Sequence, residues 1–260
     1  MPEGHTIHRL AKALRPLVGC TITATSPQGR FSEGAAAING GVLRDSQAYG
    51  KHLLLTFDGH VLHVHLGLAG SMFSTALDST PTPGVRLRMI GGSPPQAWTL
   101  LAPIRCELLT PAEADALIER LGPDALRGDD PTPAFDRIRH SGRTIGELLM
   151  DQNVIAGVGN VFRAEALHTC HVHPLRRGTD ITTEELHCLW SELTRMMRRA
   201  VREGRIITVD TPRNRKAIAD QDGRFVYKQE QCRSCGAPVR VWQLGSRTAY
   251  ACESCQPVAA

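Results

Sequence analysis

The sequence predicts an α+β fold in which a strand-rich N-terminal part precedes a helical part and a small cysteine-rich segment at the C-terminus. The strands are clearest at residues 53–57 and 61–65, two apolar runs on either side of Asp58-Gly59, a pair typical of a tight hairpin turn. Helical spacing of apolar residues is clearest over residues 183–203. Four cysteines in two close pairs mark the C-terminal segment.

A helix is expected near the N-terminus, over residues 5–18. Ile7, Leu10, Leu14 and Leu17 recur at spacings of three and four residues, which places them on one helical face.

Strands and turns are expected from residue 21 to about residue 101. Residues 76–84 and 91–95 are rich in Gly, Pro and Ser and are predicted to be loops. Residues 122–133, with the sequence GPDALRGDDPTP, are the best candidate for an interdomain linker. Beyond it, the spacing predicts helices over residues 144–151, 160–168 and 183–203.

The composition is that of a globular protein. Of the 260 residues, 42% are hydrophobic and 22% are charged, which excludes wholesale disorder. The apolar runs are far shorter than the roughly 18 residues that a membrane span needs. The N-terminal residues MPEGHTIHR contain no apolar signal core. We therefore expect a soluble, cytoplasmic protein with no membrane partner. Aromatic residues make up 5%, so base stacking on an aromatic platform is not expected to be the main binding mode.

Basic residues concentrate in the C-terminal half of the chain. Residues 1–136 carry a net charge of −2, and residues 137–260 carry +6. Of the 19 basic residues in the second half, only Lys216 and Lys228 are lysines. Arginine suits bidentate contacts with phosphate, so the charge indicates a polyanionic partner for this half. A solvated face that keeps the protein soluble is the alternative interpretation.

The cysteine pairs have the spacing of a zinc site. They read C-x2-C-x16-C-x2-C, and four thiolates can surround one Zn²⁺ as a tetrahedron with no open position, which predicts a single structural ion. Two disulfides are the alternative, which a cytosolic chain disfavours. A hairpin over residues 237–251 is expected to present Arg247 from its turn, towards a phosphate or simply towards solvent. The ligands are Cys232, Cys235, Cys252 and Cys255.

The remaining cysteines are isolated in the sequence. We expect each of them to be a small buried hydrophobic residue rather than a nucleophile. They are Cys20, Cys106, Cys170 and Cys188.

A glycine-rich turn, Gly157-Val158-Gly159-Asn160, lies between two helical patterns. Asn160 is a plausible N-cap for the second helix. Helix N-termini flanked by glycine expose backbone N–H groups and favour anions such as phosphate. A helical corner without a ligand would have the same sequence.

The N-terminus carries a possible nucleophile. Removal of Met1 leaves Pro2 with a secondary amine, and its pKa near 8 leaves a usable neutral fraction at pH 7. Such an amine can attack an aldehyde-level carbon and form an iminium ion. Glu3, the next residue, is close enough along the chain to move protons. By themselves these two residues favour an accidental Pro-Glu start.

Several short motifs, each weak alone, occur in a consistent order along nearly the whole chain. They are Met1-Pro2-Glu3-Gly4, Gly50-Lys51-His52-Leu53-Leu54-Leu55, His65-Leu66-Gly67-Leu68-Ala69-Gly70, Asp151-Gln152, Gly157-Val158-Gly159-Asn160, and the cysteine pairs with Arg247 before Cys252 and Gln256 after the last cysteine. In this combination the chain resembles the formamidopyrimidine-DNA glycosylase and endonuclease VIII family.

The resemblance implies a two-layer β-sandwich with flanking helices, then a helical domain with a helix–two-turn–helix motif, then a zinc finger. The corresponding domains would be a catalytic domain over residues 1–122, a linker over 123–133, a DNA-binding domain over 134–223 and the zinc finger over 224–260. It implies a monomer that binds damaged DNA and associates with the nucleoid when bound.

The resemblance also implies roles for individual residues. Pro2 matches the nucleophile, Glu3 the general acid, and Lys51 a hairpin lysine that contacts DNA near the lesion and assists catalysis. Asn160 and Arg247 match the pair that grips the phosphates beside the flipped nucleotide. Two further matches are His65, near the DNA backbone, and Leu68, one of the residues that fill the hole left by the flipped base.

The implied activity is that of a bifunctional DNA glycosylase and abasic-site lyase that acts through a Schiff base and cleaves the strand by β,δ-elimination. The opening Pro2-Glu3-Gly4 is similar to the endonuclease VIII branch, and residues 213–224 are short for a purine-capping loop. Residues 103–107 lack the Arg-Arg-Phe sequence of the other branch. We therefore expect a preference for oxidised pyrimidines. The alternatives are a purine-lesion glycosylase and a non-catalytic protein that binds damaged DNA.

The other histidines invite a metal interpretation. His63 and His65 alternate along one strand and so share a face. No carboxylate or third ligand is near them in the sequence, so structural or DNA-facing roles are expected instead. The same expectation applies to His60, His171 and His173.

Overall fold

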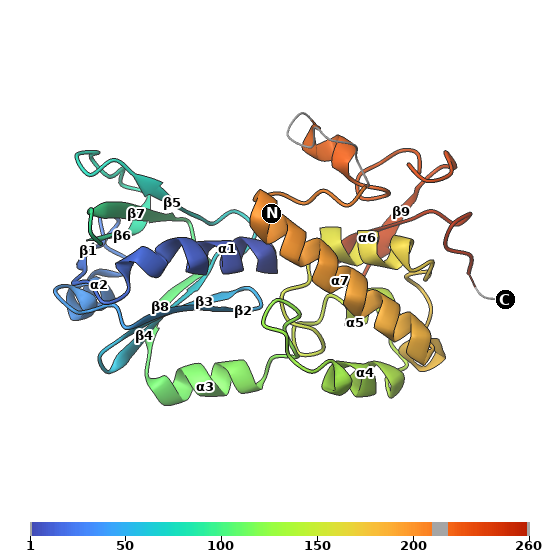
Figure 1. The fold of residues 1–260 in the computed structure, drawn as a ribbon, viewed down its shortest axis with the longest axis horizontal. Coiled ribbons are helices and arrows are strands. Elements are labelled where there is room, and N and C mark those ends of the chain that lie inside the picture. The colour runs from blue at the N-terminus through green and yellow to red at the C-terminus, as the bar shows by residue number, and fades with distance from the viewer. Residues whose placement is uncertain (1, 210–217, 259–260) are drawn as a thin grey trace. The chain divides into compact units, whose positions relative to one another are not determined.

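A computed structural model describes residues 2–209 and 218–258 (Figure 1). The chain divides into two compact units, one ending at Arg120 and the other beginning at Leu121. The predicted linker, residues 123–133, is thus contained in the second unit, where Asp124 is fully buried. Residues 210–217, which include part of the expected capping-loop region 213–224, lie outside the described residues.

The N-terminal unit is a two-layer β-sandwich, as the family resemblance implied. Each layer is a four-stranded antiparallel sheet. The first has the order β1 (Thr23–Thr25), β6 (Val85–Gly91), β7 (Gln96–Leu101) and β5 (Ser71–Thr75). The second has the order β2 (Asp45–Tyr49), β3 (His52–Phe57), β4 (His60–His65) and β8 (Arg105–Leu109).

The predicted hairpin is confirmed. Strands β3 and β4 pair with Phe57 opposite His60, so Asp58-Gly59 forms the two-residue turn, and Gly59 has a φ of +77°. Alternate side chains of both strands enter the sandwich core. The fully buried ones are Leu53, Leu55, Leu62 and Val64, which pack with Leu87 and Leu100 of the other sheet.

The first helix, α1 (Gly4–Leu14), confirms the predicted apolar face, since Ile7 and Leu14 are buried. It ends before the predicted limit of residue 18. Pro16 cannot continue an α-helix because it lacks the backbone N–H, and residues Arg15–Leu17 form a 3₁₀ turn instead. The helix packs on β2 and β3, and the Ser46 hydroxyl donates to the carbonyl of Ala11 at 2.9 Å.

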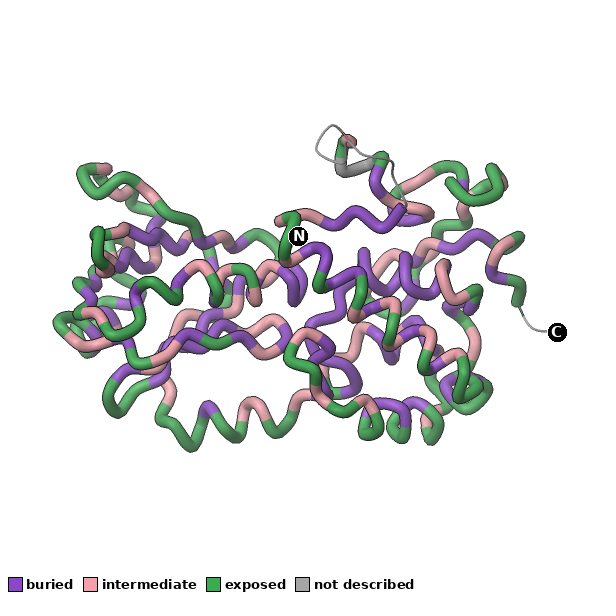
Figure 2. Tube along the Cα trace, viewed as in Figure 1, coloured by how far each residue is buried: buried purple, intermediate pink, exposed green. Residues whose placement is uncertain are grey.

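Two shorter helices complete this unit, α2 (Ser32–Ile38) and α3 (Pro111–Glu119). Helix α3 contacts β4 and β8 but is exposed along most of its length (Figure 2). Its Ala114 covers Leu54 and Val61 on the outer side of the second sheet. The rest of that outer side is left for polar residues.

The C-terminal unit is helical, with one two-stranded hairpin. Its helices are α4 (Thr132–Arg139), α5 (Ile145–Leu148), α6 (Asn160–Thr169) and α7 (Thr183–Glu203), with 3₁₀ turns at Gly178–Asp180 and Asp220–Gly223. The hairpin consists of β9 (Arg240–Leu244) and β10 (Arg247–Ala251).

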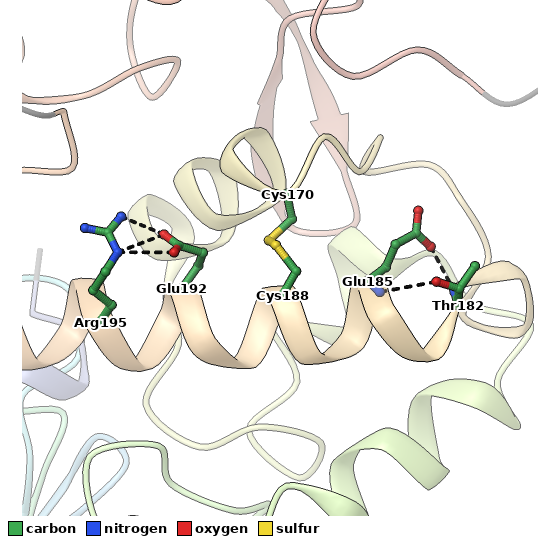
Figure 3. Close-up of a disulfide and its surroundings, with 6 residues drawn as sticks. All are labelled: Cys170, Thr182, Glu185, Cys188, Glu192 and Arg195. Atoms are coloured by element: carbon green, nitrogen blue, oxygen red, sulfur yellow. Dashed lines mark hydrogen bonds and ion pairs between the residues drawn. A yellow bond between two sulfur atoms is a disulfide. The ribbon is translucent and has the colours of Figure 1, made fainter.

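The limits of α7 agree with its predicted range. A capping box begins it: the Thr182 hydroxyl accepts from the N–H of Glu185, whose carboxylate accepts from the N–H of Thr182 (Figure 3). Gly204, with a φ of +75°, ends it. Helix α5 is much shorter than the predicted 144–151, because Asp151 accepts from the N–H of Asn153 and turns the chain.

The expectation for the isolated cysteines was wrong in two respects. Cys170 and Cys188, 18 residues apart, form a disulfide that joins the end of α6 to α7 (Figure 3). Cys20 and Cys106 are half-buried rather than buried. Burial raises the pKa of Cys106 to about 12, which makes its thiol a poor nucleophile.

Candidate functional site

Pro2 and Glu3 stand at the start of α1. Glu3 occupies the N-cap position with extended backbone angles and is 1% exposed, while Pro2 is half-buried. The Glu3 carbonyl accepts from the N–H of Thr6 at 2.9 Å, which fixes the backbone next to Pro2. A buried carboxyl group adjacent to a secondary amine can exchange protons with a molecule that reacts at that amine.

Lys51 lies in the two-residue turn between β2 and β3. Tyr49 pairs with His52, so Gly50 and Lys51 are the two turn residues. Gly50 has a φ of +55°, a conformation that glycine adopts at no steric cost. Since α1 packs on both strands, the start of α1 and this turn belong to one packed substructure, visible at the same end of the second sheet in Figure 1.

His65 ends β4 and leads into a tight turn that carries Leu68. The His65 Nδ1 accepts from the N–H of Gly67 at 3.1 Å, and the N–H of Gly70 donates to the carbonyl of Leu66. Leu68 is 57% exposed, so its apolar side chain points largely into solvent.

Ile104, which was not among the residues predicted from the sequence, adjoins this turn. Ile104 is 70% exposed, its N–H donates to the His65 carbonyl at 2.9 Å, and its side chain contacts the position that a Gly67 side chain would occupy. Two neighbouring turns therefore each present an exposed apolar side chain. Ile104 lies in a Pro-Ile-Arg loop, where no periodic spacing of apolar residues could have identified it from the sequence.

Asn160 is the first residue of α6, so the prediction that it is the N-cap was wrong: Gly159 is the N-cap. The Asn160 side chain is buried, and both its nitrogen and its oxygen form hydrogen bonds. The amide Nδ2 donates to the carbonyl of Thr248 at 2.9 Å, and the Oδ1 accepts from Arg163. Arg163 also donates to the Thr248 carbonyl at 2.9 Å.

The glycine-rich turn before α6 is fixed by Gln152. Its Oε1 accepts from the N–H of Gly157, and its Nε2 donates to the carbonyls of Val158 and Met150, all at 3.0 Å. Gly157 has a φ of +89°. This turn therefore holds the N-terminus of α6 in place. The backbone N–H groups at such a terminus favour an anion, and a nearby cationic side chain would add to this.

Arg247 supplies such a group. Arg247 pairs with Leu244 on either side of Gly245-Ser246, so it closes the predicted turn and is also the first residue of β10. Arg247 is half-buried and has no hydrogen-bond or ion-pair partner among the described residues. Its neighbour Thr248 accepts a hydrogen bond from Asn160, 88 residues earlier in the chain, so the two predicted phosphate-binding residues lie near each other.

The four cysteines of the zinc motif form one cluster. Their sulfur atoms all lie within 4.8 Å of one another, with Cys235 and Cys252 at 3.5 Å and Cys232 and Cys255 at 3.9 Å. Four thiolates bound to Zn²⁺ at about 2.3 Å would lie about 3.8 Å apart, so the cluster fits one structural zinc ion. None of the four is in a disulfide.

The pKa values of these thiols are shifted in different directions. A hydrogen bond from the Ala237 backbone lowers the pKa of Cys235 to about 7. Burial raises the pKa of Cys252 and of Cys255. His168 lies 3.2 Å from the Cys232 sulfur through its Nε2. Within the described residues, the four cysteines are the one group of three or more potential ligands close enough for a metal ion.

Two buried polar side chains form hydrogen bonds between the zinc finger and the helices. Glu165, on α6, accepts from the N–H groups of Phe225, Val226 and Tyr227 at 2.7–3.0 Å and from the Thr208 hydroxyl. Gln256 donates to the carbonyl of Val172 at 2.8 Å. Both are fully buried.

Comparison with known proteins identifies the family. Residues 1–95 match the formamidopyrimidine-DNA glycosylase N-terminal domain, and residues 121–211 match the H2TH domain of the same family. The chain is 41% identical to the Mycobacterium tuberculosis protein named Endonuclease 8 1, over 98% of this chain and all of that protein. The chain belongs to the formamidopyrimidine-DNA glycosylase and endonuclease VIII family.

Other relatives place the chain within this family. The formamidopyrimidine-DNA glycosylase of Thermosynechococcus vestitus is 29% identical, covering 99% of this chain and 97% of the relative. The higher identity to Endonuclease 8 1 confirms the predicted likeness to the endonuclease VIII branch. Membership also confirms the predicted enzyme class, a DNA glycosylase and abasic-site lyase.

Solved structures confirm the fold. The Lactococcus lactis Fpg protein bound to DNA containing N7-benzyl-Fapy-dG superimposes with a TM-score of 0.80 at 22% identity, over 99% of this chain and all of that one. Another complex of that protein, with DNA containing an abasic site, gives a TM-score of 0.79 and covers 98% of this chain and all of that one. No helix in the described residues has the length and apolar character of a membrane span.

Proposed function

We propose that this enzyme removes oxidised bases from damaged DNA, pyrimidines in preference to purines, with the Pro2 amine as nucleophile and with strand cleavage by β,δ-elimination. The observation that carries the proposal is the arrangement of Pro2 and the buried Glu3 at the start of a helix that packs on the Lys51 hairpin.

The chemistry follows from these groups. The Pro2 nitrogen attacks C1′ of the damaged nucleotide, the bond to the base breaks, and Glu3 donates the proton that opens the sugar ring. The resulting iminium ion acidifies C2′, so that loss of a C2′ proton expels the 3′ phosphate and a second elimination expels the 5′ phosphate. The mechanism requires an unacylated Pro2 nitrogen, and therefore a chain from which Met1 has been removed.

The other site residues would bind the DNA. Lys51 and His65 are proposed to contact the backbone near the lesion, and Asn160 and Arg247 the phosphates beside the flipped nucleotide. Leu68 and Ile104, both exposed and apolar, would fill the space that the flipped base leaves. In this proposal residues 1–122 form the catalytic domain, residues 134–223 the helical DNA-binding domain and residues 224–260 the zinc finger, with 123–133 between them, and one monomer suffices.

The preference for pyrimidines has two supports: the Pro2-Glu3-Gly4 opening and the identity to the protein named Endonuclease 8 1. A saturated, non-planar pyrimidine stacks poorly in the duplex, so it costs less to extrude and needs fewer pocket contacts than a purine lesion does.

Borohydride trapping across a set of lesion-containing duplexes tests both parts. The wild-type chain should form a covalent adduct with DNA, and a chain extended by one residue before Pro2 should form none. Single-turnover rates should be higher for thymine glycol and dihydrouracil than for 8-oxoguanine opposite cytosine. The reverse order would overturn the lesion preference, and trapping by the extended chain would overturn the Pro2 mechanism.

A further inference from the structure

A polar cluster covers one end of the outer face of the second sheet, next to Lys51. His52 lies directly opposite His65 on the neighbouring strand, and His65 lies opposite Arg105. Two residues further along the same face, His63 lies opposite Glu107. Three histidines, an arginine and a glutamate thus share one face, a juxtaposition that the sequence analysis missed because Glu107 is 44 residues from His63.

Hydrogen bonds connect three of these residues in a row. The Nδ1 of His63 lies 3.0 Å from the Glu107 Oε1, and the Nε2 of His63 lies 2.8 Å from the Nδ1 of His52. A carboxylate only accepts hydrogen bonds, so the His63 Nδ1 carries a proton, and in the neutral ring its Nε2 is an acceptor. The His52 Nδ1 must then donate, which leaves the His52 Nε2 unprotonated in the neutral ring.

The same reasoning assigns the tautomer of His65. Its Nδ1 accepts from the Gly67 N–H, so a neutral His65 carries its proton on Nε2. The ring of His52 meets the ring of His65 edge to face, with centroids 5.0 Å apart, and stacks on His63 at 5.1 Å. His65 is therefore held on one side by Gly67 and on the other by a ring whose own orientation depends on His63.

The surroundings keep these rings neutral. Burial, followed by the nearby His63, His65, Lys51 and Arg105, lowers the pKa of His52 to about 3. Burial lowers the pKa of His65 and of His63, although Glu107 opposes the effect at His63. A third positive charge beside Lys51 and Arg105 is thereby avoided.

We propose that Glu107, His63 and His52 form a hydrogen-bonded relay of positioning residues that orients His65 with its Nε2–H directed to a DNA phosphate oxygen beside Lys51. This inference rests on the proposed function, because it assigns the relay to the same DNA contact. The ligand is a phosphodiester, and His65 recognises it as a neutral donor rather than as a cation.

Histidine ¹⁵N NMR of the DNA-free protein at pH 7 tests the relay without reference to activity. Wild type should show His52 and His63 as neutral Nδ1–H tautomers and His65 as the neutral Nε2–H tautomer. Replacing His63 by Phe should mix the His52 tautomers. His60→Phe is the matched control, because it removes an exposed histidine from the other end of the same strand and should leave all three signals unchanged. A charged His63, or His52 protonated on Nε2, would overturn the relay.

Trapping rates then connect the relay to DNA. His63→Phe should lower the single-turnover rate by about 10-fold at pH 7, an effect of the size found when supporting side chains are removed from a site. His63→Gln can still accept from His52 and donate to Glu107, so it should stay within about 2-fold of wild type while losing less rate below pH 6. Equal rates and equal pH profiles for wild type and both variants would overturn the proposal.

The two proposals fail in different ways. Absence of trapping by the wild-type chain would defeat the proposed function and leave the NMR result untouched. Should His63→Phe fold poorly, Glu107→Ala replaces it, since the Glu107 side chain is 40% exposed. Glu107→Ala should leave the His63 ring free to adopt either tautomer and should lower the single-turnover rate, as His63→Phe does. Its control is Glu119→Ala, which changes an exposed glutamate of α3. An unchanged His63 tautomer in Glu107→Ala would count against the relay.

Discussion

The two units of the chain hold their candidate site residues by different means. In the N-terminal unit, Lys51 and Leu68 stand in turns at the ends of strands whose inner faces are packed with leucine and valine. In the C-terminal unit, Asn160 is fixed by buried polar groups, Arg163 and the Thr248 carbonyl, and the segment beyond it by Glu165. The positions of the candidate site residues therefore depend on apolar packing beneath turns in the N-terminal unit. In the C-terminal unit they depend on satisfied hydrogen bonds and a metal site.

This difference has a physical consequence. Apolar packing is distributed over many contacts, so that no single side chain is indispensable. A buried polar network depends on every member, because removal of one leaves another without a partner in a medium of low dielectric constant. We therefore expect single changes to act by different routes, through lost hydrogen-bond or metal partners in the C-terminal unit and through cavities in the N-terminal unit, and the following predictions test this.

The largest expected effect is loss of the zinc site. Cys252→Ser removes one of four thiolates, and since a structural zinc ion contributes folding free energy, the finger should unfold and DNA binding should be lost. Metal analysis of the purified variant should find less than one zinc per chain, and the amide exchange of the sandwich should be unchanged. Zinc-free wild-type protein with normal DNA affinity would contradict the structural role.

Glu3→Gln should lower base excision by about 10²- to 10⁴-fold, because an amide cannot donate the proton. DNA affinity and thermal stability should change little, since the substitution keeps the shape of the side chain. Single-turnover excision and equilibrium binding on the same duplex separate the two effects. Equal losses in both would show that the residue acts through folding instead.

Glu165→Gln should cost about 3 kcal/mol of unfolding free energy in the C-terminal unit, because an NH₂ group would replace one oxygen that accepts from backbone N–H groups. Glu230→Gln, an exposed glutamate of the same unit, is the control and should cost little. Leu53→Ala in the sandwich should cost about 2–5 kcal/mol through its cavity, confined to the N-terminal unit. Amide exchange of each unit measures these changes separately.

Arg247→Ala should weaken DNA binding evenly across flanking sequences and reduce the slope of log affinity against log salt by about 1, as expected for one phosphate contact. The fold should be unaffected, because Arg247 has no hydrogen-bond or ion-pair partner among the described residues. Binding titrations at several salt concentrations measure the slope. A sequence-dependent loss would indicate a base contact rather than a phosphate contact.

A further expected effect is on pH dependence, and it belongs to the N-terminal unit. The pKa of His52 is lowered from 6.5 to about 3, so between these values the unfolded chain binds a proton that the folded chain does not. Stability from this group is complete above pH 6.5 and declines as the pH falls towards 3. Over this range, thermal melts should show wild type losing stability relative to His52→Phe as the pH falls, and parallel curves would contradict this.

Much of the local structure follows from the sequence, because the signals are local. The Asp58-Gly59 hairpin needs only a turn and two apolar runs, and the zinc motif contains all four ligands within 24 residues. The apolar spacing and capping residues of α7 lie within its own range. The Pro2-Glu3 start and the Asn160 turn were found through their resemblance to a family, since neither pattern is specific alone.

What the tertiary structure decided is which distant residues meet. Strand pairing places Glu107 against His63, the approach of α6 to β10 places Asn160 against Thr248, and the packing of α6 on α7 joins Cys170 to Cys188. Sequence spacing specifies which side chains share a face of one element, but the partner element and its register depend on burying apolar surface across the whole unit. For that reason the cysteine pair, the histidine relay and the role of Ile104 became visible only once the chain was folded.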